Sequence, residues 1–263
     1  MKELLLKASK DAGKLLMRHY GRIKYVREKR QKSYFTNVDI ESEKLIISAI
    51  RKKFPKHNII SEETGKIDNG SDYTWYIDPV DGTHNYIHTL PMFGVSIALA
   101  HKGQVILGIV NLPYFNETYF AEKGKGAFLN GKRMKVSRQK DAKRAFVVTD
   151  LALRYHPDEK IKALRSLKGK VYDIRVLGCA VYAHTLVAKG AVDAYFTLHT
   201  HSWDVAAGAL IVEEAGGRVT GIDGSKWNLG QSQFAMSNGK VHKEILRIIN
   251  CVPKIQDKKR DLS

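Results

Sequence analysis

Hydrophobic residues recur at helical spacing in two segments near the start of the chain. The first segment predicts an amphipathic helix that ends before Gly21, on the apolar positions Leu4, Leu5, Ala8, Ala12, Leu15 and Leu16. A basic segment follows to Lys32. Asp39 then precedes a second helical stretch that Pro55 ends, with Leu45, Ile46, Ala49, Ile50 and Phe54 on one face.

The next part of the chain alternates short apolar runs with turn residues, as strands do. The predicted strands cover 58–61, 75–77, 93–100, 105–112, 118–121, 127–129 and 134–136. Asn130-Gly131 lies between the last two runs, and this dipeptide is a strong hairpin signal. The first part of the chain therefore reads as two helices followed by a mostly antiparallel sheet.

After about Ala145 the pattern changes to alternating strands and helices. The expected strands are 146–149, 171–176 and 192–198, and the expected helices are 157–168, 181–188 and 204–212, the last closed by Gly216-Gly217. This alternation predicts a second, α/β layer. We expect an N-terminal half at residues 1–145, a C-terminal half at 146–252 and a basic, frayed tail at 253–263, with the halves packed as a single catalytic unit.

Composition narrows the class of protein. With 43% hydrophobic residues the 263-residue chain reads as globular. No apolar run approaches the roughly 20 residues that span a bilayer, and charged residues interrupt any signal-peptide core near the N-terminus. The two cysteines, Cys179 and Cys251, lack both disulfide and metal-ligand spacing. A reducing cytoplasm is the expected location.

The chain is strongly basic, with a net charge of +17. Such a charge concentrates anionic substrates and also attracts nucleic acid or anionic membranes without specificity. From Lys123 to Arg144 nine basic residues accompany one acid, Asp141. These segments lack the interleaved aromatic residues of a single-strand binding groove, so a solvated basic surface is favoured over a nucleic-acid site, which stays an alternative.

The most informative stretch is residues 76–83 (YIDPVDGT), where an apolar strand meets a glycine turn. Asp78 and Asp81 are three positions apart, and one or two carboxylates plus a substrate phosphate can complete the oxygen shell of Mg²⁺. Gly82 lets backbone N–H groups approach an anion closely. Asp-Pro and Asp-Gly also form ordinary turns, so this stretch alone does not distinguish a metal and phosphate site from a turn.

Further carboxylates stand where the predicted elements turn. Glu62 and Glu63 follow a short strand, and Asp39 and Asp204 each stand at the start of a helix. Asp39 and Asp204 could be simple N-caps, and the Glu pair could belong to a solvated loop. Taken alone, each residue favours the simpler interpretation, an N-cap or a solvated loop, but the four acids together favour a metal site.

Four ordered motifs resemble those of the inositol monophosphatase family. They are 78–86 (DPVDGTHNY), 203–208 (WDVAAG) continuing to 214–217 (EAGG), 36–39 (TNVD) and 61–63 (SEE), and the likeness extends from about Leu4 to Ile249. The resemblance implies a layered αβαβα sandwich of mixed α+β and α/β character, shared with fructose-1,6-bisphosphatases. It also implies Mg²⁺-dependent hydrolysis of phosphate monoesters, lithium sensitivity and a homodimer.

The resemblance assigns roles residue by residue. The family's metal ligands, for two or three Mg²⁺ ions, match Glu62, Asp78, the Val80 carbonyl, Asp81 and Asp204. The family's catalytic residues match Thr83, Asp39 and Glu62, the first two acting on the water nucleophile. The substrate contacts match Glu62, Val80, Asp81, Gly82, Thr83, Arg175, Gly178, Cys179, Ala180 and Asp204.

Two departures leave the substrate open. Cys179 replaces a hydroxyl residue in 175–180 (RVLGCA), and a thiol is a weak hydrogen-bond partner. Thr197 stands where inositol-selective members carry a Glu. Inositol monophosphate remains the favoured substrate, with fructose 1,6-bisphosphate, another sugar phosphate or a 3′-phosphonucleotide as alternatives. A transcription-complex or RNA accessory protein is the alternative from another class. Lys32 is a candidate match to the family's basic loop before Asp39.

Overall fold

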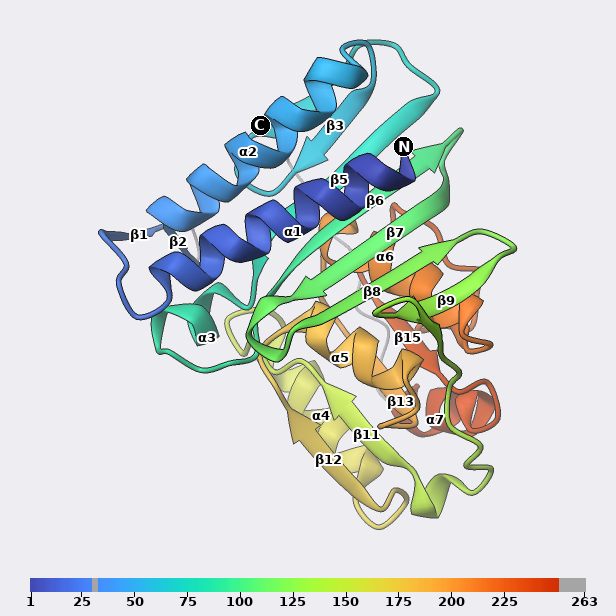
Figure 1. Cartoon of the computed structure of the whole chain (residues 1–263). Helices are drawn as coiled ribbons and strands as arrows, with labels where there is room; N and C mark the ends of the chain where they lie inside the picture. The colour runs from blue at the N-terminus through green and yellow to red at the C-terminus, as the bar shows by residue number, and fades with distance from the viewer. Residues whose placement is uncertain (30–32, 251–263) are drawn as a thin grey trace.

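Layers of helices and sheets alternate through the molecule (Figure 1). The computed structural model describes residues 1–29 and 33–250. Lys32, Cys251 and the tail 253–263, which the sequence analysis discussed, lie outside the described residues. In order, the layers are a helix pair, a large sheet, a second helix pair, a smaller sheet and a third helix pair. This arrangement is the αβαβα sandwich predicted from the sequence.

The outer helix pair consists of α1 (Lys2–His19) and α2 (Asn37–Lys53), which cover one face of the large sheet. The apolar face predicted for each helix is the buried one, with Leu5, Leu16, Ile46 and Ile50 fully buried against the sheet. A short ribbon of β1 (Val26–Glu28) and β2 (Tyr34–Thr36) connects the two helices.

The large sheet has the order β10-β9-β8-β7-β6-β5-β3-β4. Its strands are β3 (Asn58–Ser61), β4 (Gly65–Ile67), β5 (Tyr73–Asp81), β6 (Gly94–His101), β7 (Gln104–Leu112), β8 (Glu117–Glu122), β9 (Gly126–Leu129) and β10 (Lys132–Arg133). Neighbouring strands are antiparallel except β3 and β5, which are parallel. The carboxyl ends of β3 and β5 therefore lie at the same edge of the sheet.

The second helix pair, α5 (Ala180–Ala188) and α6 (Ser202–Glu214), lies between the two sheets. Because both sides of α6 face protein, every residue from Val205 to Val212 is buried. Gly208 permits the close approach of α5, since a Cβ atom at this position would lie 2.2 Å from Nδ1 of His184. Small and apolar residues are thus what this central layer requires.

The smaller sheet and the last helices complete the C-terminal part. The sheet has the order β12-β11-β13-β15-β14, formed by β11 (Phe146–Thr149), β12 (Asp173–Val176), β13 (Ala194–Thr197), β14 (Arg218–Gly221) and β15 (Phe234–Ser237). Its outer face carries α4 (Pro157–Leu167) and α7 (His242–Ile249). The short helices are α3 (Thr83–Ile87), η2 (Pro113–Phe115) and η3 (Ala142–Arg144). None of the described helices is long and apolar enough to cross a bilayer.

Several boundaries differ from the prediction. The strand expected at 134–136 is wrong: β10 is Lys132–Arg133, and Val136 leaves the sheet to donate its N–H to the Ala215 carbonyl. The predicted hairpin at Asn130-Gly131 is confirmed by the β9–β10 pairing. The strand expected at 75–77 is longer, because β5 continues through the Asp-Pro-Val-Asp motif with a bulge between Asp78 and Asp81. An isolated Asp-Pro turn is therefore excluded.

Candidate metal and phosphate site

Two parallel strands bring the first acidic residues together. Ser61 at the end of β3 lies opposite Ile77 of β5, and the Glu62 N–H donates to the Ile77 carbonyl at 3.2 Å. Glu62 is thereby placed beside Asp78. After Asp81 the chain turns at Gly82, which has φ of +80°, and a Cβ atom there would lie 2.7 Å from the Met92 carbonyl oxygen. Only glycine fits this turn, from which α3 begins at Thr83.

Helices of the central layer supply the other side of the site. Asp204 stands in the first turn of α6, which packs against β5 and β6. Asp81 accepts a hydrogen bond at 2.6 Å from the Val181 N–H in the first turn of α5. The side chain of Asn85 donates to the carbonyls of Met92 and Leu177, at 2.8 Å each. These contacts tie the motif in the large sheet to the C-terminal half.

Each of the four carboxylates is held through one oxygen only. Oε1 of Glu62 faces Lys29 Nζ at 3.1 Å, and Oδ1 of Asp78 accepts from Val80 N–H at 3.0 Å. Oδ2 of Asp81 accepts from Val181 N–H, and Oδ2 of Asp204 accepts from His201 N–H at 2.9 Å. Within residues 1–29 and 33–250 the second oxygen of each carboxylate has no hydrogen-bond partner. Four oriented oxygen donors are thus left for a ligand.

The electrostatics of the cluster favour a cation. Burial, with the charges of Glu62, Asp81 and Asp204, raises the pKa of Asp78 well above its usual value. Burial and the Asp204 charge raise the pKa of Asp81 to about 7. Burial also acts on Asp204, but hydrogen bonds from His201 and Thr200 hold its pKa below the usual range. Carboxylates that oppose one another's ionisation in this way are the ligand set expected of a hard divalent ion.

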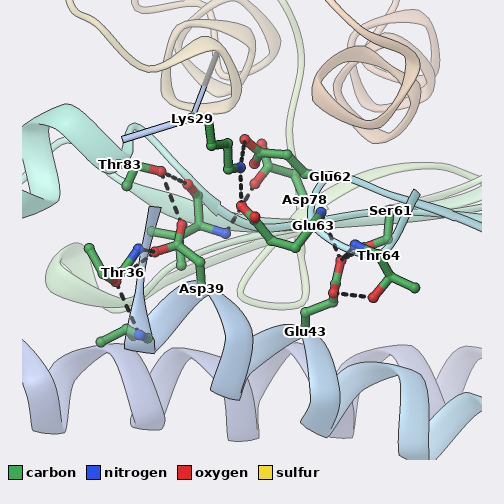
Figure 2. A network of polar contacts seen from close by, with 12 residues as sticks. Lys29, Thr36, Asp39, Glu43, Ser61, Glu62, Glu63, Thr64, Asp78 and Thr83 are labelled. Atoms are coloured by element: carbon green, nitrogen blue, oxygen red, sulfur yellow. Dashed lines mark hydrogen bonds and ion pairs between the residues drawn. The ribbon is translucent and has the colours of Figure 1, made fainter. Parts of the chain in front are cut away.

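The ammonium group of Lys29 provides a positive charge beside the acidic residues. In the described part of the chain, no group of three His, Cys, Asp or Glu side chains is arranged so that all three could bind one metal ion. The Lys29 ammonium instead lies between Glu62 and Glu63 and donates to both (Figure 2). Although burial opposes its charge, the two carboxylates raise the pKa of Lys29. Lys29 was missed in the sequence, where only Lys32 was considered as a match to the family's basic loop.

Asp39 lies behind the cluster, in contact with Thr83. Its Oδ2 accepts from the Thr36 N–H at 2.8 Å and from the Thr36 hydroxyl at 2.6 Å (Figure 2). Thr36 is the N-cap of α2 and Asp39 is its third residue, so the alternative that Asp39 is simply the N-cap is excluded. Asp204 is likewise the third residue of α6, after an N-cap at His201. In both helices the cap holds Oδ2 and leaves Oδ1 toward the site.

A pocket of about 180 Å³ collects these groups. Of the residues predicted to form the site, its lining includes Glu62, Asp78, Val80, Asp81, Gly82, Thr83, Gly178, Cys179, Ala180 and Asp204. Asp39 is fully buried behind Thr83 and does not line it. The assembled residues come from both sheets and the helices between them, as the four motifs together indicated.

Among the predicted substrate contacts, Arg175 is the one that does not line the pocket. Its guanidinium lies 2.6 Å from Asp173 in the same strand and over the Phe146 ring. The reason is that β12 is an edge strand whose end is exposed. Thr197 is buried and donates its hydroxyl proton to the His199 carbonyl at 3.0 Å. Neither residue lines the pocket in this arrangement.

Cys179 contacts the site as a small buried residue. Its Sγ lies 3.2 Å from Oδ2 of Asp81, and burial, with the Asp81 charge, raises the pKa of the thiol well above its usual value. A thiolate nucleophile is thus disfavoured.

The pocket also has lining residues that the sequence did not single out. They are Ser33, Tyr34, His84, Asp150, Ala152, Arg154, Tyr155, Tyr195 and Thr200. His199, His201 and Trp203 line it as well. Arg154 stacks on the Tyr155 ring at 5.0 Å, and its charge, after burial, lowers the pKa of His84. Asp150, Ala152, Arg154 and Tyr155 follow β11, and Thr200 follows β13, in segments that no motif marked.

The layered fold and the acidic pocket define a protein of the inositol monophosphatase and fructose-1,6-bisphosphatase class. The sequence model described as the inositol monophosphatase family matches residues 1–254. The chain therefore belongs to this family, which is of the phosphatase type.

Similar proteins carry different names. A fructose-1,6-bisphosphatase/inositol-1-monophosphatase of Thermotoga maritima is 39% identical over 246 residues, covering 93% of this chain and 94% of that protein. A Nus factor SuhB of Pseudomonas aeruginosa is 39% identical over 258 residues, covering 95% of each. The crystal structure of the extragenic suppressor protein suhB of Bartonella henselae has a TM-score of 0.91 at 31% identity, covering 94% of this chain and 97% of the other.

Proposed function

We propose that the protein hydrolyses a small phosphate monoester in a Mg²⁺-dependent reaction, with inositol monophosphate as the favoured substrate. The observation that carries this proposal is the set of four carboxylates, Glu62, Asp78, Asp81 and Asp204, each with one oxygen held and one unpartnered at the same small pocket. Several carboxylate oxygens that converge on one pocket repel one another unless a cation or a proton joins them.

The four carboxylates and the Val80 carbonyl would hold two or three Mg²⁺ ions. Bound there, the metal would act as a Lewis acid and lower the pKa of a water. The Val80 carbonyl accepts from the Thr83 hydroxyl at 2.8 Å in the structure. A ligand on this carbonyl would leave the hydroxyl proton to Asp39, whose Oδ1 is 3.2 Å away.

The chain's own groups would position the reactants. Thr83 can accept a hydrogen bond from the attacking water and orient it, and when the water gives up its proton to the Thr83 oxygen, the Thr83 proton can pass to Asp39. The first N–H groups of α3, from Gly82 and Thr83 onward, have no partner within the helix and would bind the phosphate oxygens. The N-termini of α5 and α6 also line the pocket at Ala180 and Trp203. Their partial positive charge would favour the same anion.

A second candidate substrate is a sugar bisphosphate such as fructose 1,6-bisphosphate. Arg154 favours it, because this guanidinium lines the pocket and has no carboxylate partner in the described part of the chain. The nearby Asp150 faces Lys160 instead, at 3.6 Å. A pocket wall with a guanidinium suits a second anionic group better than a neutral polyol. A 3′-phosphonucleotide is the remaining alternative in the same chemistry.

The test is a phosphate-release screen on the purified protein. Inositol 1-phosphate, fructose 1,6-bisphosphate and an adenosine 3′,5′-bisphosphate are compared with and without Mg²⁺. We expect release only with Mg²⁺, and the ratio of kcat/KM between the first two compounds identifies the substrate. No release from any of these compounds in Mg²⁺ would reject the proposal.

A role in a transcription complex is the candidate from a different class. It is supported by the name of the Pseudomonas relative and by the net charge of +17. An Asp81→Asn protein that keeps the biological effect of the wild type would favour this role over catalysis. Loss of the effect in parallel with phosphatase activity would favour the enzyme.

The remaining properties that we propose follow from the family. They are a homodimer, sensitivity to Li⁺, a cytoplasmic location and one catalytic unit formed by residues 1–145 and 146–252 together. Sedimentation and inhibition of phosphate release by Li⁺ test the first two.

A further inference from the structure

Glu43 is a buried carboxylate of α2 that does not reach the pocket. Its side chain is directed at the turn after β3, which carries Glu62 (Figure 2). Only 4% of the residue is exposed. It stands four positions after Asp39, so both acids lie on the same face of the helix.

The Glu43 carboxylate accepts hydrogen bonds from four donors in one short turn. Oε1 accepts from the Ser61 hydroxyl, from the Glu63 N–H at 3.0 Å and from the Thr64 N–H at 3.1 Å. Oε2 accepts from the Thr64 hydroxyl at 2.5 Å. The residues held in this way flank Glu62 on both sides, and Glu62 itself is left to face Lys29 and the pocket.

This arrangement restricts where Glu62 can move. On the strand side the Glu62 N–H donates to Ile77, and on the helix side Glu43 holds Ser61, Glu63 and Thr64. The backbone of Glu62 is thus fixed relative to β5, which carries Asp78, and to α2, which carries Asp39. A ligand residue fixed before binding loses less conformational freedom when the ion arrives.

We propose that Glu43 is a positioning residue for the metal site, because it fixes the position of Glu62 through the 61–64 turn. This inference rests on the metal site proposed above. It assigns Glu43 neither contact with substrate nor contact with metal. The position of Glu62 then depends on the length of the Glu43 side chain and not on its negative charge.

Two conservative variants separate reach from charge. Glu43→Asp keeps the charge but is one methylene shorter, so it cannot span the same four donors. Glu43→Gln keeps the reach, and its amide oxygen can still accept from Ser61, Glu63 and Thr64 while the amide nitrogen donates to the Thr64 hydroxyl. Isothermal titration with Mg²⁺ measures the affinity of each full-length variant without any need for turnover.

We expect Glu43→Asp to bind Mg²⁺ about 10- to 100-fold more weakly than the wild type, as is usual when a residue that orients a metal ligand is lost. Glu43→Gln should lose less than about tenfold. If the loss is larger for Gln than for Asp, the charge of Glu43 acts on the site and the inference is wrong. Unchanged affinity in both variants overturns it as well.

Glu214 provides a matched control. It also holds a turn through its carboxylate, accepting from the Gly124 and Gly126 N–H groups at 2.7 Å each, but this turn is outside the pocket. Glu214→Asp should lower thermal stability and leave Mg²⁺ affinity unchanged. A parallel loss of affinity in this control would assign the effect to general destabilisation and reject the role of Glu43. Absence of Mg²⁺ binding by the wild type would instead reject the metal site itself.

Discussion

The Thr83 hydroxyl lies 3.2 Å from Oδ1 of Asp39, across 44 positions of sequence. Asp39 can hold this position because the Thr36 cap fixes its other oxygen. Burial raises the pKa of Asp39, although these hydrogen bonds oppose the shift. The same hydroxyl is 2.8 Å from the Val80 carbonyl. The hydroxyl proton thus has two acceptors within reach, and a metal ion on the Val80 carbonyl, as proposed above, would leave it to Asp39.

Thr83→Val removes this hydroxyl with little change of shape. We expect kcat for phosphate release to fall by about 10²- to 10⁴-fold, the usual contribution of a group that positions and deprotonates a nucleophile. Thr83→Ser keeps the hydroxyl and is the control. A Val variant as active as the Ser variant would remove Thr83 from the mechanism.

Asp81→Asn should abolish activity and leave the fold intact. The amide oxygen can still accept from the Val181 N–H, while one negative charge leaves a crowded cluster. We therefore expect the metal-free variant to melt no lower than the wild type, and the Mg²⁺-induced rise in Tm to be lost. Asp173→Asn, which changes an exposed acid paired with Arg175, is the control. Near-normal turnover in Asp81→Asn would contradict the assignment.

Lys29→Met should lower the stability of the metal-free protein. The ammonium is the cation recorded beside Glu62 and Glu63, which are largely buried. Removing it leaves these acids without a charged partner, at a cost of about 1–3 kcal/mol. Mg²⁺ should then raise Tm more in the variant than in the wild type. Lys66→Met, which breaks an exposed pair with Asp68, should neither lower the stability of the metal-free protein nor increase the rise in Tm with Mg²⁺. Equal Mg²⁺ shifts in wild type and Lys29→Met would show that Lys29 and the metal do not compete.

Arg154→Met tests the substrate. If Arg154 binds a second anionic group, kcat/KM for fructose 1,6-bisphosphate should fall by about 10- to 100-fold, and kcat/KM for fructose 1-phosphate should change little. Arg175→Met is the matched control, because that guanidinium pairs with Asp173 outside the pocket. A selective loss with Arg175→Met instead would support the role that the family resemblance gave to Arg175.

His242 should make the fold sensitive to mild acid. It is buried between the Thr220 and Ser237 hydroxyls, at 2.9 and 2.8 Å, and burial lowers its pKa to about 4. In the unfolded chain the imidazole takes up a proton near pH 6.5, whereas in the folded chain it stays neutral to about pH 4. The stability it confers is complete above pH 6.5 and is lost as the pH falls toward 4.

The expected contribution is about 2 kcal/mol between pH 7 and pH 5. Urea unfolding of the wild type and of His242→Gln at both pH values measures it. The variant should be less stable at pH 7 but should lose less on acidification. The same pH dependence in both proteins would remove His242 as the cause.

Much of the fold could be read from the sequence, because α1, α2 and the strands around them have regular apolar spacing. The strands β14 and β15 and the helix α7 were not recognised, since their patterns are short and their pairing is set by distant partners. The ribbon β1–β2 is exposed in β1 and has no apolar alternation. The boundary error at 134–136 arose because Val136 is satisfied by Ala215, a partner that sequence spacing cannot reveal.

The site was predictable where residues are held by local motifs and not where they depend on tertiary placement. Asp78, Asp81 and Gly82 share one strand and turn, and Asp39 and Asp204 begin helices. Arg154 and Lys29 reach the site from segments without a motif. Arg175 was expected at the pocket but lies on an edge strand, beside Asp173.

The candidate site draws on both parts of the chain. Asp78 and Asp81 lie in β5 of the large sheet and Glu62 follows β3, whereas Arg154 and Tyr155 follow β11 of the smaller sheet. Among the described residues, the hydrogen bonds that hold these three carboxylates come from neither Arg154 nor Tyr155. Under the proposed function, substitutions at Arg154 or Tyr155 would therefore change the choice of phosphate ester without moving Asp78.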